Sequence, residues 1–134
     1  MGAWGKGTFE NDKACDFAAN VAEGSGLVLL EQALDRVLAS EATYLDASDA
    51  EKGLAAADIV ARLKGSPGDQ TSYTARIDAW IERSKSKPSD ALIEKARRSI
   101  ARILTEPSAL LELWQDSGDL EVWKQSVDEV SRRL

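Results

Sequence analysis

Three carboxylates near the start of the chain have the residue types and spacing that best suit chemistry. They are Glu10, Asp12 and Asp16, and the two aspartates are separated by about one helical turn. Magnesium and calcium are bound by several oxygen ligands that converge on one point, so these residues are candidate metal ligands. Acidic side chains also complement the positive end of a helix, and the frequency of such capping favours that structural interpretation.

The residue types that the chain lacks exclude most other reactions. Histidine is absent, which removes the usual general base near neutral pH, the Ser–His and Cys–His nucleophile pairs and most zinc sites. Cys15 is the only cysteine, which excludes an internal disulfide and a cysteine-cluster metal site. We therefore expect no cofactor and favour a non-catalytic protein, with a metal-assisted reaction at the three carboxylates left open.

Two large aromatic residues stand in an unusual N-terminal segment. Trp4 and Phe9 are interleaved with glycines, whose backbone entropy opposes a helix. We expect the rings to dock on the helices, since burying one aromatic side chain contributes about 1.5–3 kcal/mol. The alternative is that they contact a ligand or partner. The candidate ligand or partner surface consists of Trp4, Phe9, Asn11, Asp12 and Asp16.

A short basic ridge is predicted on the fifth helix. Lys95, Arg98 and Arg102 are spaced to lie on one face, opposite the apolar stripe of that helix. Such a ridge can contact an anionic partner. The commoner arrangement is a solvated face paired with carboxylates, here Glu94 with Arg98.

The elements that must position these residues are amphipathic helices, because apolar residues recur at three- and four-residue intervals. A first helix is expected to start at Asn11 or Asp12 and to end before Gly24. A second carries the stripe from Leu27 to Leu38. The third is alanine-rich, with Ser48 and Glu51 at capping-box spacing and Gly65 at its end.

The second half of the chain continues the helical pattern. The stripe from Tyr73 to Ile81 predicts a short fourth helix, and Ser89 is expected to cap the fifth. Pro107 suits the first turn of a sixth helix. The spacing from Leu120 to Leu134 predicts a last helix that runs to the end of the sequence. Three tryptophans fall on apolar stripes and are expected in the core: Trp80, Trp114 and Trp123.

These patterns predict an all-α protein. No segment shows the two-residue alternation of a half-buried strand, and no linker is long enough to separate two domains. We predict one helical domain over residues 1–134, a compact array of six to seven short amphipathic helices. The irregular glycine and aromatic segment at the N-terminus is expected to dock on that array.

Charge and hydropathy restrict the partners. The chain has 23 acidic and 17 basic side chains, a net charge of −6 that repels nucleic acid and anionic lipid. The longest apolar runs are far shorter than the ~18 residues of a membrane helix. The first residues lack the apolar stretch of a secretory signal. We expect a cytoplasmic protein whose partner is another protein, not nucleic acid or membrane, with its oligomeric state open.

The opening residues also carry a resemblance. Residues 1–12 read Met-Gly-Ala-Trp-Gly-x-Gly-x-Phe-Glu-Asn-Asp, and Ala14, Asp16 and Phe17 follow. This pattern resembles the bacterial domain-of-unknown-function 4259 family. The resemblance continues through Leu30–Leu34, the alanine-rich helix and the Leu113 to Trp123 segment, so it covers essentially the whole chain. Phe17 stands where that family is expected to have tryptophan, a change that is conservative in size.

The resemblance implies a small, stand-alone, intracellular bacterial helical domain with no established biochemical activity and no catalytic residues to carry over. It marks a signature made of Trp4, Gly5, Gly7, Phe9, Asn11, Asp12 and Asp16. The leading functional hypothesis is a non-catalytic protein-binding module, with an inhibitor or immunity-type protein as one form. The alternative is a metal-dependent hydrolase or a small-ligand-binding domain that uses the N-terminal acidic cluster.

Overall fold

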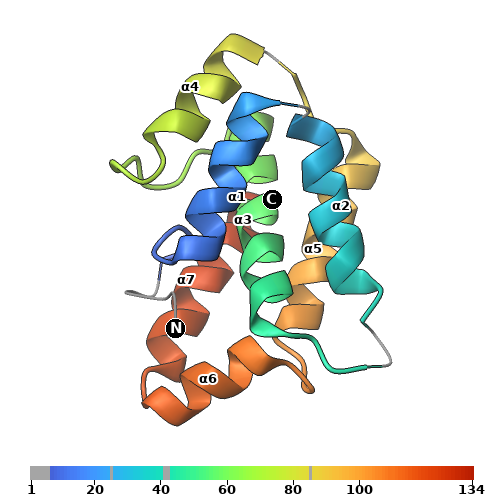
Figure 1. Ribbon diagram of the computed structural model, residues 1–134, viewed down its shortest axis with the longest axis vertical. Helices are drawn as coiled ribbons and strands as arrows, with labels where there is room; N and C mark the ends of the chain where they lie inside the picture. The colour runs from blue at the N-terminus through green and yellow to red at the C-terminus, as the bar shows by residue number, and fades with distance from the viewer. Residues whose placement is uncertain (1–6, 25, 41–42, 85) are drawn as a thin grey trace.

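The computed structural model describes residues 7–24, 26–40, 43–84 and 86–134. Over these residues the chain forms seven α-helices and no strand, as the periodicity predicts (Figure 1). Their bounds are α1 Asp12–Glu23, α2 Gly26–Leu38, α3 Ala47–Lys64, α4 Ala75–Ser84, α5 Asp90–Ile103, α6 Ala109–Ser117 and α7 Leu120–Arg133.

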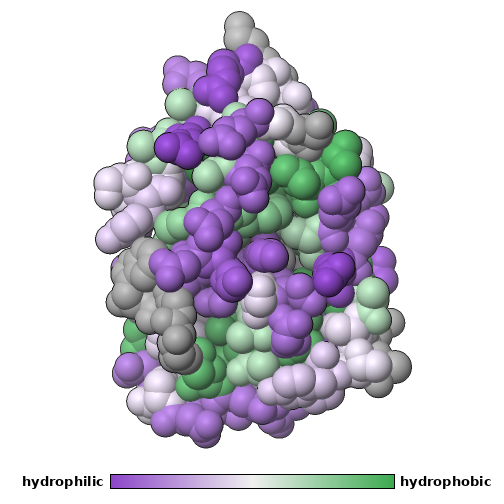
Figure 2. Space-filling view, in the orientation of Figure 1, coloured by the Kyte–Doolittle hydropathy of each residue, from purple (hydrophilic) through white to green (hydrophobic). Residues whose placement is uncertain are grey.

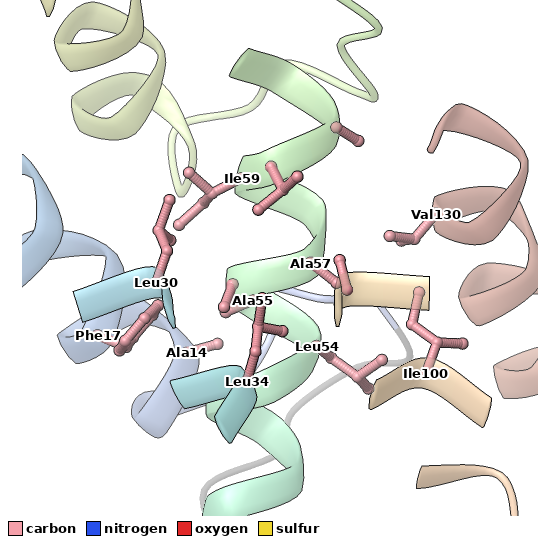
Figure 3. Close-up of a cluster of buried hydrophobic side chains, with 14 of the residues drawn as sticks. Ala14, Phe17, Leu30, Leu34, Leu54, Ala55, Ala57, Ile59, Ile100 and Val130 are labelled. Carbon is pink, nitrogen blue, oxygen red and sulfur yellow. The ribbon is translucent and has the colours of Figure 1, made fainter. Parts of the chain in front are cut away.

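Helix α3 is the centre of the fold. It packs against every other helix, with α1 and α2 on either side of it in Figure 1, α4 at its upper end and α6 across its lower end. Figure 3 shows side chains of α1, α2, α5 and α7 converging on α3. The small residues of α3 permit this close packing. At Gly53, for example, a Cβ atom would lie only 2.4 Å from Cγ2 of Val37 in α2, which is too close for a larger residue to fit without a shift.

Short polar side chains cap α1, α3 and α5. Asn11 caps α1 through a hydrogen bond from the backbone nitrogen of Ala14 to its Oδ1, 2.8 Å long, and Ser89 caps α5. The predicted start of α3 is wrong, because Asp46 and not Ser48 is its N-cap. Asp46 has extended backbone angles, and its Oδ1 accepts a 2.8 Å hydrogen bond from the nitrogen of Asp49.

The apolar stripes form the core, with a few exceptions. Leu27 and Tyr73 begin their predicted stripes but are 38% and 47% exposed, because the packed part of each stripe starts later. Trp80 and Trp123 are buried as expected. Trp114 is half-buried, and its ring stacks on that of Trp123 with a centroid distance of 6.1 Å.

Hydrophilic side chains cover most of the face shown in Figure 2, with apolar patches between them. Among the described residues, no helix combines the length and apolar character needed to cross a bilayer.

Candidate functional site

The N-terminal segment is docked on the helices where the structure describes it. Phe9 is 5% exposed, and its carbonyl oxygen accepts a hydrogen bond from Sγ of Cys15 in α1. This confirms the expected docking for Phe9. The prediction for Trp4 lies outside the described residues.

The polar residues of the signature have separate roles. Asn11 is buried as the cap of α1, and Asp12 is exposed in the first turn of that helix. The carboxylate of Glu10 accepts a 2.9 Å hydrogen bond from the nitrogen of Gly7. Asp16 is exposed and lines a groove of about 480 Å³ between α1, α2 and α3.

The three candidate metal ligands therefore do not converge. Within the described ranges, no group of three or more Asp, Glu, Cys or His side chains is arranged to hold a metal ion. The signature instead places a turn of backbone, residues 7–10, beside a cluster of buried charges that sequence reasoning missed.

Two charged residues of α3 form the centre of this cluster. Asp58 and Arg62 are nine-tenths or more buried, and Nε of Arg62 donates a 2.9 Å hydrogen bond to Oδ1 of Asp58. The other two nitrogens of Arg62 donate to Oδ1 of Asp78 and to the backbone oxygen of Asp69, at 2.8 and 2.9 Å. Arg62 thereby joins α3 to α4 and to the loop between them. The only signal in the sequence is a charged pair within an alanine-rich helix.

Helix α7 contributes a second arginine to the cluster. Nη2 of Arg133 lies 3.0 Å from Oδ1 of Asp58, Nε donates to Glu129 and Nη1 donates to the backbone oxygen of Ser66. Burial by itself lowers the pKa of Arg133, but the carboxylates of Asp58 and Glu129 more than compensate and raise it above its ordinary value. Arg133 therefore stays charged.

The docked turn lies against this charge cluster. The Cζ atom of Arg62 is 5.6 Å from the centroid of the Phe9 ring, which is within the range of a cation–π interaction. The burial of Phe9 is thus coupled to the ion pairs beneath it.

A pocket of about 370 Å³ opens beside the turn and the ion pairs, and we call it the N-terminal pocket. It is lined by Gly7, Thr8, Phe9, Glu10, Asp58, Arg62, Asp69, Thr71, Tyr73, Thr74, Ser126, Glu129 and Arg133. Four of these residues carry carboxylates and two carry guanidiniums. Each guanidinium nitrogen already contacts a protein oxygen, so the lining has an excess of negative charge and of hydrogen-bond acceptors.

The predicted basic ridge of α5 is only partly solvated. Lys95 bridges to Glu31 and Asp35 of α2 at 2.8 Å each, and these contacts raise its pKa. Glu94 pairs with Arg97 at 3.7 Å, so the predicted pair with Arg98 is wrong. Arg102 is buried, because the loops before α3 and after α5 supply carbonyl acceptors for it.

Comparison with known proteins supports the family resemblance. No curated protein and no solved structure matches the chain. A family model described as "domain of unknown function (DUF4259)" matches residues 2–126, which is nearly the whole chain. The chain therefore belongs to the DUF4259 family.

Proposed function

We propose that this protein is a non-catalytic protein-binding module whose N-terminal pocket receives a basic side chain of the partner. The charge balance in that pocket carries the proposal, because four carboxylates face two guanidiniums that are already paired. A lysine or arginine side chain supplies a cation and hydrogen-bond donors that the lining lacks. An inhibitor or immunity-type protein that binds a basic effector is one form of such a module.

The remaining charge of the molecule supports the same class of partner. A net charge of −6 accelerates encounter with a basic protein and disfavours an acidic one. The ring of Tyr73, 47% exposed in the same lining, supplies apolar surface against which the stem of a long cationic side chain packs.

The test uses short peptides with blocked ends and no other charged residue, which differ at one position that is arginine, lysine or glutamine. Amide signals of the protein are followed by NMR during titration. We expect the arginine and lysine peptides to shift the signals of Thr71 and Thr74 saturably, and the glutamine peptide to leave them unchanged. Shifts that are equal for all three peptides, or absent for all, contradict the proposal.

A matched pair of variants locates the binding. Asp69 lines the pocket, and its carboxylate is in no ion pair with the described residues, so Asp69→Asn removes a negative charge without breaking the cluster. Asp128 is exposed on α7 and does not line the pocket, so Asp128→Asn is the control. Only Asp69→Asn is expected to weaken binding of the arginine peptide.

A small-ligand-binding domain is the second candidate, and the size of the pocket favours it. Its volume falls within the range of about 300–1,000 Å³ that is typical of small-molecule sites. Butylguanidine separates the two functions, because it carries the cation without a peptide backbone. If it binds as tightly as the arginine peptide, the pocket serves a small amine or guanidine; much weaker binding favours a protein partner.

A further inference from the structure

The two arginines that line the N-terminal pocket each bind acceptors from three parts of the chain. Arg62 donates hydrogen bonds to α3, to α4 and to the loop between them, at 2.8–2.9 Å. Arg133 contacts α3 and donates hydrogen bonds to α7 and to the same loop. A guanidinium suits this task because its N–H donors point in fixed, separate directions within one plane. The chain therefore uses arginine where acceptors surround a buried cation.

A lysine of the same protein binds carboxylates in a different arrangement. Nζ of Lys95 in α5 lies 2.8 Å from a carboxylate oxygen of Glu31 and 2.8 Å from one of Asp35, which are one turn apart on the exposed face of α2. A single nitrogen serves both carboxylates, because they converge on one point. An ammonium is a compact, strongly hydrated charge with all its donors on one atom. It fits convergent acceptors at the surface better than acceptors spread around a pocket.

The N-terminal pocket presents carboxylates from three separate parts of the chain. Glu10 lies in the docked turn, Asp69 in the loop after α3 and Glu129 in α7. Glu10 and Glu129 each use a single oxygen in their hydrogen bonds with the described residues, and Asp69 uses its backbone oxygen instead of its carboxylate. A carboxylate has about four acceptor sites, so all three retain acceptors for a guest. Their arrangement resembles that around the two internal arginines.

The loop that carries Asp69 is held against the ion pairs. Its backbone oxygen accepts a 2.9 Å hydrogen bond from Arg62, and the backbone oxygen of Ser66 accepts one of 3.1 Å from Arg133. At Gly68, a Cβ atom would lie 2.7 Å from Nη2 of Arg133, so the loop packs directly on that guanidinium. Acceptors that are positioned before binding favour a guest whose donors match their directions. Geometry, and not charge alone, therefore discriminates between cations in this pocket.

We propose that the side chain received by the N-terminal pocket is an arginine and that the pocket selects it over lysine. This inference rests on the proposed function and adds the identity of the cation. A guanidinium donates along its plane to carboxylates on different sides of the pocket, whereas an ammonium leaves part of these acceptors unpaired. The guanidinium is also more weakly hydrated, so it loses less when it leaves water. The partner surface that fits this pocket therefore carries a protruding arginine.

Blocked peptides with arginine, lysine or citrulline at one position test the selection, with dissociation constants measured by NMR titration of the full chain. Citrulline keeps the planar group of arginine without its charge. We expect arginine to bind at least about tenfold more tightly than lysine, which cannot bind a carboxylate bidentately, and citrulline to bind most weakly. Lysine that binds as tightly as arginine overturns the inference and leaves the proposed function standing. If neither arginine nor lysine binds more tightly than citrulline, charge plays no part and both fail.

Two variants of the lining separate geometry from charge. Glu10→Gln and Glu129→Gln each replace one carboxylate oxygen by a donating nitrogen, and the remaining oxygen can still accept the hydrogen bond seen in the structure. The preference for arginine over lysine is expected to fall at least about threefold in each, because the guanidinium loses one acceptor. Asp128→Asn removes an exposed charge outside the pocket and is expected to leave the preference unchanged.

The ratio of the two dissociation constants is the informative quantity, because a general loss of negative charge weakens both peptides alike. Thermal unfolding verifies that each variant is folded. A ratio that stays unchanged in both Glu10→Gln and Glu129→Gln overturns the inference.

Discussion

Asp58 in α3 and Arg133 in α7 form an ion pair in which Oδ1 lies 3.0 Å from Nη2, and both side chains are largely buried. The same oxygen accepts the hydrogen bond from Arg62, so one carboxylate holds two guanidiniums. Through these two arginines, a single aspartate connects the central helix to α4, to α7 and to the loop after α3.

Replacement of Asp58 by asparagine tests the strength of this connection. The neutral amide leaves two buried cations with reduced compensation, and loss of one partner of a buried ion pair costs about 3–5 kcal/mol. We expect that loss in the free energy of unfolding measured with urea. Glu129→Gln is the control, because Glu129 is 48% exposed on its side chain and its pair with Arg133 is worth about 0–1 kcal/mol. Similar small effects of both variants would show that the cluster contributes little.

The start of α3 provides a second prediction. Asp46→Ala removes the hydrogen bond to the nitrogen of Asp49 and is expected to destabilise the protein by about 0.5–2 kcal/mol. Ser48→Ala lies inside the helix and is expected to cost less than about 0.5 kcal/mol. Thermal unfolding of the two variants under identical conditions decides between them. A larger effect for Ser48→Ala would indicate that Ser48, and not Asp46, caps α3.

The contrast between these two regions shows what the sequence reveals about the fold. Helix stripes and caps depend on residues three to four positions apart. The helices can therefore be predicted from the local sequence, as can the caps Asn11 and Ser89. Ser48 is favoured wrongly because two nearby polar residues, Asp46 and Ser48, offer competing caps for α3. Only the backbone conformation at the start of α3 shows which of these two residues is the N-cap.

The charge cluster was missed for a different reason. Asp58 and Arg62 are spaced like an ordinary exposed ion pair of a helix, and nothing local indicates that alanines bury that face. One partner of Arg62, Asp78, is 16 residues away and lies in a separate helix. Arg102 was likewise predicted on a solvated ridge, because its burial depends on the carbonyls of two loops. The N-terminal pocket and the burial of Arg102 therefore depend on tertiary contacts that periodicity does not encode.

Gly26 at the start of α2 lies against the ring of Trp80. A Cβ added at Gly26 would be 2.1 Å from Cζ2 of that ring, which is buried and has little room to move. Gly26→Ala is therefore expected to destabilise the protein by about 1–3 kcal/mol despite the better helix propensity of alanine. Gly24→Ala is the control, since its nearest neighbouring atom would be 3.8 Å away. Urea unfolding of both variants measures the difference, and equal stabilities would contradict the close contact.

Glu51 in α3 gives a prediction for pH. Burial raises its pKa, the nearby Asp12 raises it further, and Lys13 offsets part of the effect. The folded state thus binds this proton more tightly than the unfolded state, so the charged form of Glu51 weakens the fold at neutral pH. Glu51→Gln is expected to stabilise the protein at pH 7, and the gain is expected to shrink as the pH falls towards about 4.

Urea unfolding at several pH values measures this gain relative to the unmodified chain. Asp128→Asn, which removes one exposed negative charge, corrects for the change in net charge. A gain that is the same at every pH, or a loss at pH 7, would show that burial does not govern the ionisation of Glu51.

The stacked tryptophans of α6 and α7 provide the last prediction. Trp123 is 3% exposed, and its ring is nearly parallel to that of Trp114, with an interplanar angle of 7°. Trp123→Ala removes a buried aromatic side chain and is expected to cost about 3–5 kcal/mol, while Trp114→Ala is expected to cost less because Trp114 is half-buried. Near-UV circular dichroism reports the stacking itself, so either variant should reduce the same tryptophan bands. If Trp123→Ala costs less than about 1 kcal/mol, the ring is not part of the core. If the bands of the two variants change independently, the rings do not stack in solution.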